Sequence, residues 1–482
     1  MRQVETPQGR CRLGVARCDV TPPIGIYHRM WGAATHERAT GVHRPLTATA
    51  LVLQAHDLSP KPATEQVVVA VDHCLLWARE MDALLAAVSG QTGLAREQVS
   101  IAFSHTHAAG LMDLSRAHLP GGDLIPPYLD ELAERMAGII RAARQAVQTA
   151  TLSYTTGRCT LAANRDYWDE ATRQFVCGFN PEGPADDTVL IVRANDSAGR
   201  ILASVVNYAC HPTTLAWENT LISPDYPGAL REVVEGATGA PCVFVQGASG
   251  DLGPRVGFVG DPAVADRNGR QLGYAVLTAL EALPPPLTRF EYQGPVVSGA
   301  TLGAWTQAAL DEPSRCSKAQ WRLRRWVVDL PYRPELPTLE QARAERTRWH
   351  QEEQDALQRG DAARARDCHA QVERQDRWLT RLATLPRGKT FPMPVALWQI
   401  GDGFWLAVEG EFYQDLQRGL RARCPGMPLV VATVVNGARP TYLPPRALYG
   451  KGIYQEAIAV LESGSLERLI EVIGAQLNAW RD

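Results

Sequence analysis

The stretch Gln98–Ser104 (QVSIAFS) is a short apolar run that ends in polar residues, and it predicts a buried strand. Three further runs of this kind occur in the first two thirds of the chain: Gln66–Cys74, Ile201–Ala209 and Pro241–Gln246. β-branched residues are frequent in them, and polar residues or glycines bound them, as is typical of strands. Because nearly every position of these runs is apolar, we expect sheets that are covered on both faces.

Helical patterns lie between these predicted strands. Residues 128–147 place an apolar side chain at every third or fourth position, behind the helix-start signal Pro126-Pro127. Further along, residues 395–409 predict a β-hairpin that turns at Gly401-Asp402-Gly403. Strands that alternate with helices are typical of α/β proteins, so we expect an α/β fold.

The segment from residue 312 to 388 has a different composition. Thr338–Gln358 and Ala362–Leu385 are rich in Arg, Glu, Gln and Ala, and Gly360-Asp361 between them supplies a helix end and an N-cap. This pattern predicts a helical hairpin with one narrow apolar stripe on each helix, which something must cover. We expect it to mediate a homo-oligomer, with a lid over the main domain as the alternative. The predicted domains are a main domain, 1–311 with 389–482, and an inserted helical segment, 312–388.

Composition and charge exclude several classes of protein. Hydrophobic residues make up 45% of the 482 residues and charged residues 21%, as in ordinary globular proteins. The net charge of -3 shows no basic excess for binding nucleic acid. No apolar stretch approaches the roughly 20 residues that span a bilayer, and residues 1–12 lack the apolar core of a signal peptide. We therefore expect a cytoplasmic protein that acts on a small molecule, without a nucleic-acid partner or an integral membrane segment.

Histidines follow two of the predicted strands. His105 and His107 come directly after the run that ends at Ser104, and His211 comes after the run that ends at Ala209. Residues two apart on an extended chain point to the same side, so we expect both imidazoles of the first pair to face one side. Zinc takes three or four N, O or S donors from separate segments, so these strand ends indicate a metal site. Buried histidines that bind backbone carbonyls are the alternative.

A loop of small residues, Gln246–Pro254 (QGASGDLGP), follows a third strand. It lacks the Lys-Ser/Thr pair of a phosphate-binding P-loop. Ser249 is a candidate nucleophile, although its surroundings differ from the G-x-S-x-G motif. Four residues of this loop are candidates for contact with a substrate: Ser249, Gly250, Asp251 and Gly253.

The order of these motifs is itself informative. After SHTHAAG come Asn164-Arg165, NYACHPTTL, SPDYPG, QGASGDLGP, Gly410-Glu411-Phe412 and Thr441-Tyr442-Leu443-Pro444, with Tyr454 downstream. From about Arg12 to Val472, outside the helical hairpin, the sequence resembles the amino-terminal catalytic domain of the neutral/alkaline non-lysosomal ceramidases. The resemblance implies two sheets sandwiched between helical layers. It also implies a zinc-dependent hydrolase that cleaves an amide, with an ester or a lactone as the second choice.

The resemblance further implies a role for individual residues. The implied zinc ligands are His105, His211, Glu411 and Tyr442. The implied substrate-polarising, catalytic residues are His107, Arg165 and Tyr454.

Two departures from the family bear on the mechanism and the substrate. The ceramidase loop reads G-D-x-S-P with the serine as proposed nucleophile, whereas this chain has Gly253 at that position. We therefore expect a metal-activated water to attack the substrate, with Ser249 as the alternative nucleophile. The family's carboxyl-terminal immunoglobulin-like domain has no counterpart in these 482 residues, so we expect a substrate smaller than a long-chain sphingolipid. Two other functions remain open: a metal-dependent lyase or isomerase on a polyhydroxylated substrate, and a non-catalytic metal-binding scaffold.

Overall fold

The four apolar runs form strands of one sheet in the computed structural model, which describes residues 3–481. Every residue of three of these strands is buried, which confirms the expectation of strands covered on both faces. The sheet has eight strands, in the order β14 (Cys242–Gln246), β12 (Ile201–Tyr208), β11 (Thr188–Asn195), β7 (Gln148–Arg158), β2 (Gln8–Asp19), β4 (Thr47–Ala55), β5 (Glu65–Val71) and β6 (Val99–Phe103).

The two ends of this sheet, β14 and β6, lie close together in space. Each strand of a sheet is rotated by roughly 20–25° from its neighbour, and over the whole sheet this accumulates to roughly 140–175°. Residues 433–436 bridge the remaining gap, because the Thr433 amide donates to the Gln246 carbonyl and the Asn436 amide donates to the Ile101 carbonyl. The carboxyl ends of strands that are far apart in the sheet order therefore meet at one place.

A second sheet packs against the first one. Its order is β18 (Trp321–Pro331), β19 (Thr390–Ile400), β20 (Gly403–Val408) and β22 (Leu429–Ala432). Side chains of both sheets form one buried cluster, in which the stacked rings of Trp398 and Trp405 lie among aliphatic residues such as Val205. The antiparallel pair β19–β20 confirms the predicted hairpin, and Gly401 adopts a positive φ at its turn.

Helices cover the outer faces of the sheets and confirm the α/β class. Helices α1 and α2 pack on β4, β5 and β6, and α3 and α4 pack on β11, β12 and β14. Helices α8 and α10 pack on the second sheet. Their bounds are α1 (Ala78–Thr92), α2 (Ile125–Gln145), α3 (Tyr226–Thr238), α4 (Pro262–Glu281), α8 (Asp415–Arg423) and α10 (Ser465–Arg481).

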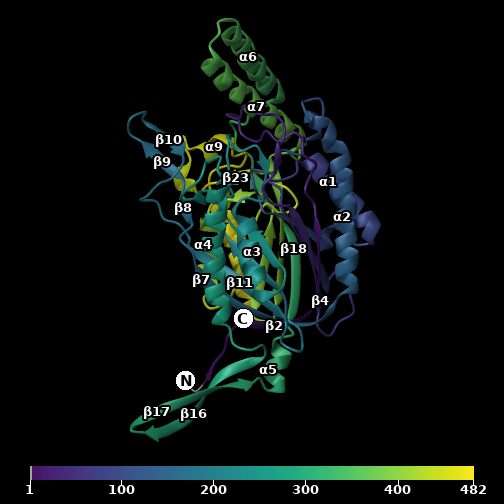
Figure 1. The fold of residues 1–482 in the computed structure, drawn as a ribbon, viewed down its shortest axis with the longest axis vertical. Helices are drawn as coiled ribbons and strands as arrows, with labels where there is room; N and C mark the ends of the chain where they lie inside the picture. Colours follow the sequence, from purple (N-terminus) through teal and green to yellow (C-terminus); the bar gives the residue numbers. More distant parts are fainter. Residues whose placement is uncertain (1–2, 482) are drawn as a thin grey trace.

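Helices α6 (Leu339–Gln358) and α7 (Ala362–Thr384) lie side by side at one end of the molecule (Figure 1). The predicted helical segment 312–388 also contains α5 (Glu312–Ser317) and strand β18, so it is not helical throughout. Strand β18 pairs with β19 along its whole length and is the edge of the second sheet. An edge strand is only half buried and therefore accommodates the arginines that made this stretch look like part of a solvated helix.

At the opposite end, a long hairpin projects from the body (Figure 1). It consists of β16 (Thr288–Ser298) and β17 (Ala300–Ala309), and β1 (Gln3–Val4) pairs with it. None of the helices in the described part of the chain is long and apolar enough to cross a membrane. The remaining short strand pairs are β3 (Gly41–Val42) with β13 (Leu221–Ile222), β8 (Ala162–Asn164) with β15 (Leu252–Pro254), β9 (Asp166–Asp169) with β10 (Gln174–Cys177), and β21 (Glu411–Phe412) with β23 (Tyr442–Leu443).

Candidate metal centre

The four residues predicted as zinc ligands come together at the carboxyl ends of the strands. The Nε2 atoms of His105 and His211 are 2.9 Å apart, and Glu411 Oε2 lies 3.2 Å from the first and 3.4 Å from the second. The hydroxyl of Tyr442 lies 3.5 Å from His211 Nε2. Both histidines and Tyr442 are buried, and the side chain of Glu411 is only 11% exposed.

The backbone explains how four distant segments converge. His105 follows β6 and His211 follows β12, at the place where the twisted sheet brings strand ends together. In the short parallel pair of β21 and β23, Glu411 is the direct partner of Tyr442, so one pairing positions two side chains. His105 and Thr441 have φ values of 68° and 58°, a left-handed conformation that costs free energy in residues other than glycine. Such strain at the centre is typical of functional sites.

The hydrogen bonds of the two histidines leave their Nε2 atoms free for a cation. His105 Nδ1 lies 2.7 Å from the Cys74 carbonyl oxygen, and His211 Nδ1 lies 3.0 Å from the Ser249 carbonyl oxygen. A carbonyl only accepts, so each Nδ1 carries a proton, and each Nε2 is the nitrogen that a cation would bind. Ligand atoms about 2.0–2.1 Å from a tetrahedral zinc would lie roughly 3.3 Å from one another. The donor set therefore fits zinc in both chemistry and spacing.

The electrostatics of the centre give His211 and Glu411 the protonation states that a metal requires. Burial lowers the pKa of His211 to about 3, and the positive charge of Arg165 lowers it further, so this imidazole is neutral. Burial opposes the ionisation of Glu411, but His105 next to it holds the pKa of that carboxyl well below its usual range. Metal ligands are neutral imidazoles and ionised carboxylates. His105 differs: burial opposes its charge, but Cys74 and Glu411 raise its pKa well above the usual value, so a metal would have to displace a proton from it.

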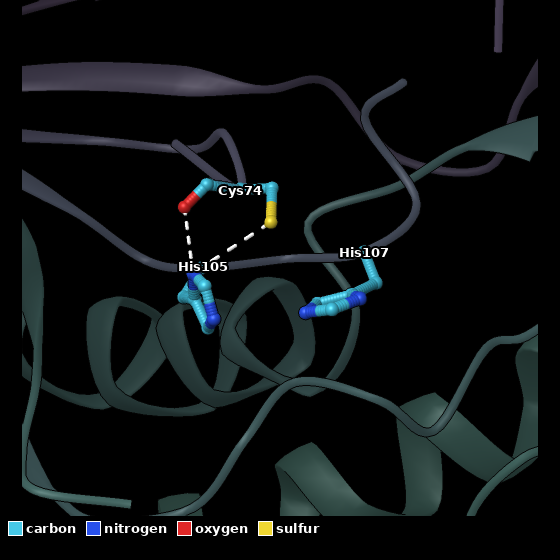
Figure 2. Close-up of side chains that lie close together, drawn as sticks. All are labelled: Cys74, His105 and His107. Atoms are coloured by element: carbon cyan, nitrogen blue, oxygen red, sulfur yellow. Dashed lines mark hydrogen bonds between the residues drawn. The ribbon is translucent and has the colours of Figure 1, made fainter. Parts of the chain in front are cut away.

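A second group of candidate ligands, Cys74, His105 and His107, overlaps the first (Figure 2). Cys74 Sγ lies 3.6 Å from His105 Nδ1, but that nitrogen already binds the Cys74 carbonyl and cannot also hold a metal. This favours the group of His105, His211 and Glu411, and leaves His107 outside the ligand set.

The sequence predicted that His105 and His107 lie on one face of an extended strand, and this prediction is wrong. Strand β6 ends at Phe103, the positive φ of His105 turns the chain, and the His107 amide then donates to the Pro212 carbonyl. The two imidazole rings are consequently perpendicular, with centroids 5.1 Å apart. Within the described residues, His107 Nε2 is buried without a hydrogen-bond partner.

The two other predicted catalytic residues also adjoin the centre. Arg165 donates to the Gly250 carbonyl through Nε and Nη2, and its Nη2 lies 3.1 Å from the Tyr442 hydroxyl. Tyr454 is the first residue of α9 (Tyr454–Ile458), and its ring centroid lies 6.0 Å from that of Tyr442.

A cavity of about 480 Å³ opens onto the centre. His105, His107, Arg165, Glu411, Tyr442 and Tyr454 line one side of it. Aromatic side chains and helix α7 form much of the remaining wall. The sequence analysis had not identified these residues as part of the site: Trp31, Trp77, Trp217, Phe258, Arg374, Arg377 and Arg381. Helix α7 thus covers the centre of its own chain, as the lid alternative requires; the oligomeric state stays a prediction.

The predicted substrate loop supports the centre from behind rather than lining the cavity. Ser249 contacts His211, the Gly250 carbonyl fixes Arg165, and the Asp251 carboxyl accepts hydrogen bonds from Gln414. Gly253 lies next to the side chain of Arg165, because a β-carbon at this glycine would be 3.8 Å from Arg165 Cδ. Direct contact between this loop and a substrate stays a prediction.

Comparison with known proteins agrees with this geometry. The family model for the amino-terminal part of neutral/alkaline non-lysosomal ceramidases matches residues 11–259, which include His105, Arg165 and His211. The fold is similar to that in the crystal structure of neutral ceramidase from Pseudomonas aeruginosa, with 16% identity, a TM-score of 0.64, and coverage of 98% of this chain and 74% of that chain. A structure described as "Ceramidase complexed with C2" gives a TM-score of 0.66 at the same identity and coverage. No curated protein sequence matches the chain. The chain belongs to the neutral/alkaline non-lysosomal ceramidase family.

Proposed function

We propose that the chain is a zinc-dependent amidohydrolase, in which a metal-activated water cleaves an amide bond of a small or moderate-sized substrate. An ester or a lactone is the second choice of substrate. The observation that carries the proposal is the convergence of two imidazole Nε2 atoms and one carboxylate oxygen at the spacing of a tetrahedral zinc site. A zinc ion held there would polarise the scissile carbonyl and lower the pKa of a bound water toward about 7. Family membership supports the hydrolase class, and a ceramidase-like sandwich of two sheets between helical layers would frame the centre.

The residues around the centre have distinct parts in this reaction. Burial and the neighbouring His105 and His211 hold the pKa of His107 well below its usual value, so its imidazole is neutral. Its Nε2 has no partner among the described residues, so it would take a proton from the attacking water and pass that proton to the leaving amine. Arg165 is fixed by the Gly250 carbonyl and Tyr442, and with Tyr454 it would stabilise negative charge on the carbonyl oxygen. The residues that would hold the zinc are His105, His211, Glu411 and Tyr442.

The surroundings of Ser249 favour water over serine as the nucleophile. Its hydroxyl accepts from Gln246 Nε2 at 2.5 Å and lies 3.3 Å from His211 Nδ1, on the side of the ring away from Nε2. Gly253, at the position of the family's serine, has no side chain to attack a substrate. Ser249 is therefore better placed to position His211 than to form an acyl-enzyme.

A panel of simple amides, assayed with and without a chelator, tests the proposal. We expect turnover that the chelator abolishes and zinc restores, and products whose combined mass exceeds that of the substrate by one water. A lyase or an isomerase would give products without added water. If the protein binds metal but turns over no amide, ester or lactone of the panel, it is a non-catalytic metal-binding scaffold.

A further inference from the structure

The helix that covers the cavity carries an arginine with no hydrogen-bond or ion-pair partner among residues 3–481. Arg381 of α7 lines the cavity and is only 7% exposed. Its guanidinium group makes no hydrogen bond and no ion pair within the described residues, and its Nε and Nη1 atoms are fully buried. The group lies over the rings of Trp77 and Trp378, at 5.7 and 4.8 Å from their centroids. A buried charge without a partner is costly, so its retention points to a ligand.

Other N–H donors of the cavity wall also have no acceptor. The Nε1 atoms of Trp31 and Trp77 and the Nε atom of Arg377 are buried donors without partners among residues 3–481. The acids of the wall are already committed, because Glu373 pairs with Arg116 at 2.9 Å and Glu411 belongs to the metal centre. Within the described part of the chain, the wall of the cavity therefore contains five unpartnered donors, three of them on the cationic side chains of Arg377 and Arg381, and both of its carboxylates are already paired.

Arg381 keeps its charge and lies near the reacting centre. Burial lowers its pKa to about 10, while the nearby groups of Tyr454 and Glu411 raise it, so the guanidinium stays protonated at neutral pH. A planar guanidinium binds a carboxylate through two parallel hydrogen bonds. The aromatic rings beside it exclude water and hold the fork in one orientation.

We propose that the substrate of this cavity carries a carboxylate, which Arg381 binds with the support of Arg377. This inference rests on the proposed function. An amide substrate that also carries a free carboxylate is an acylated amine with an acid group, such as an N-acyl amino acid. The apolar part of the wall would receive the acyl chain, and the arginines of α7 would fix the acid end. Arg381 is then a specificity-determining residue.

The test compares two probes that differ only in their terminal group, the carboxylate of N-octanoylglycine and the neutral carboxamide of N-octanoylglycinamide. We expect the wild-type protein to bind the acid about 10- to 100-fold more tightly than the amide, as measured by calorimetry. The Arg381→Met variant should lose most of this preference, and Arg381→Lys should retain part of it. Arg366→Gln, on the exposed face of the same helix, is the matched control and should keep the full preference. The same order should hold after a chelator has removed the metal, since a carboxylate bound only by metal would then lose its preference.

Several outcomes separate this proposal from the proposed function. Equal binding of acid and amide by the wild-type protein overturns the carboxylate site, even if both probes are hydrolysed and even if Arg381→Met does not fold. Tighter binding of the corresponding phosphonate, N-octanoylaminomethylphosphonate, overturns the choice of carboxylate. A preference that vanishes in Arg381→Met while neither probe is ever cleaved supports the anion site and removes the hydrolase.

Discussion

His105 Nε2 and His211 Nε2 lie 2.9 Å apart in a buried site, and Glu411 Oε2 lies 3.2 Å from the first and 3.4 Å from the second. Each histidine uses its Nδ1 proton on a backbone carbonyl, which turns the two Nε2 atoms toward one another and toward the Glu411 carboxylate. A cation or a proton must therefore occupy the space between these three atoms, and we expect zinc binding to release a proton from His105.

The first prediction concerns the zinc content of the protein and of variants at the centre. We expect about one zinc per chain, and His105→Ala or His211→Ala should lose most of it, because each removes one of four donors. His118→Ala, which changes an exposed histidine away from the centre, is the control and should keep the metal. Elemental analysis of the purified proteins measures this, and equal zinc in all four proteins would show that the assigned centre is wrong.

The second prediction separates His107 from the ligands. His107→Ala should retain zinc and lose turnover by roughly 10²–10⁴-fold, as is typical when a positioned acid or base is removed. Metal content and kcat are measured on the same preparation. If the variant loses its metal instead, His107 is a ligand and the proton must come from another group.

The sequence predicted the strands and the histidines at their ends because burial on both faces leaves a continuous apolar run. It did not reveal β18, since the arginines of an edge strand resemble those of a solvated helix. Glu411 and Tyr442 depended on family resemblance, because the pairing of β21 with β23 is too short to leave a pattern. Arg381 was missed for a different reason: an arginine in a charged helix usually faces solvent, and only the packing of α7 over the cavity buries it.

The third prediction concerns the two glycines of the loop at residues 250–253. A β-carbon at Gly253 would meet nothing closer than Thr213 Oγ1 at 3.6 Å, whereas one at Gly250 would lie 2.9 Å from the Phe412 carbonyl group. Gly253→Ser should therefore leave the melting temperature nearly unchanged, and Gly250→Ser should cost about 1–3 kcal/mol. Thermal unfolding of the pair measures the difference. Equal destabilisation by both would mean that the family's serine position is closed in this chain.

The fourth prediction concerns Asp251 and pH. Burial raises the pKa of its carboxyl to about 7, although hydrogen bonds from Gln414 oppose the rise. Between about pH 4 and 7 the folded state holds a proton that the unfolded state has released, so this group makes the protein less stable as pH rises through that window, by up to roughly 4 kcal/mol. Above pH 7 the contribution is constant. Asp251→Asn should flatten this part of the stability profile, while Asp123→Asn, at an exposed position, should not.

The fifth prediction concerns how α7 is held over the centre. Glu373 of α7 accepts from Arg116 of the main domain at 3.0 Å, and Arg116 also donates to the Tyr27 hydroxyl at 2.8 Å. Glu373→Gln removes the nearer of the two carboxylates that pair with this buried guanidinium, and only Asp113 at 3.8 Å remains, so we expect a cost of up to about 3–5 kcal/mol. We expect faster hydrogen exchange along α7 and a higher KM, with zinc retained because no ligand lies in the hairpin.

The matched control for this variant is Glu345→Gln on α6, which removes an exposed pair with Arg348 and should cost less than about 1 kcal/mol. Unchanged hydrogen exchange along α7 in Glu373→Gln would mean that apolar packing alone holds the helix in place.

Deletion of residues 338–385 distinguishes a lid from a structural support. Because α7 forms one wall of the cavity and supplies none of the proposed ligands, the shortened protein should keep its zinc while its substrate range changes. Loss of zinc on deletion would instead make the hairpin part of what holds the centre together.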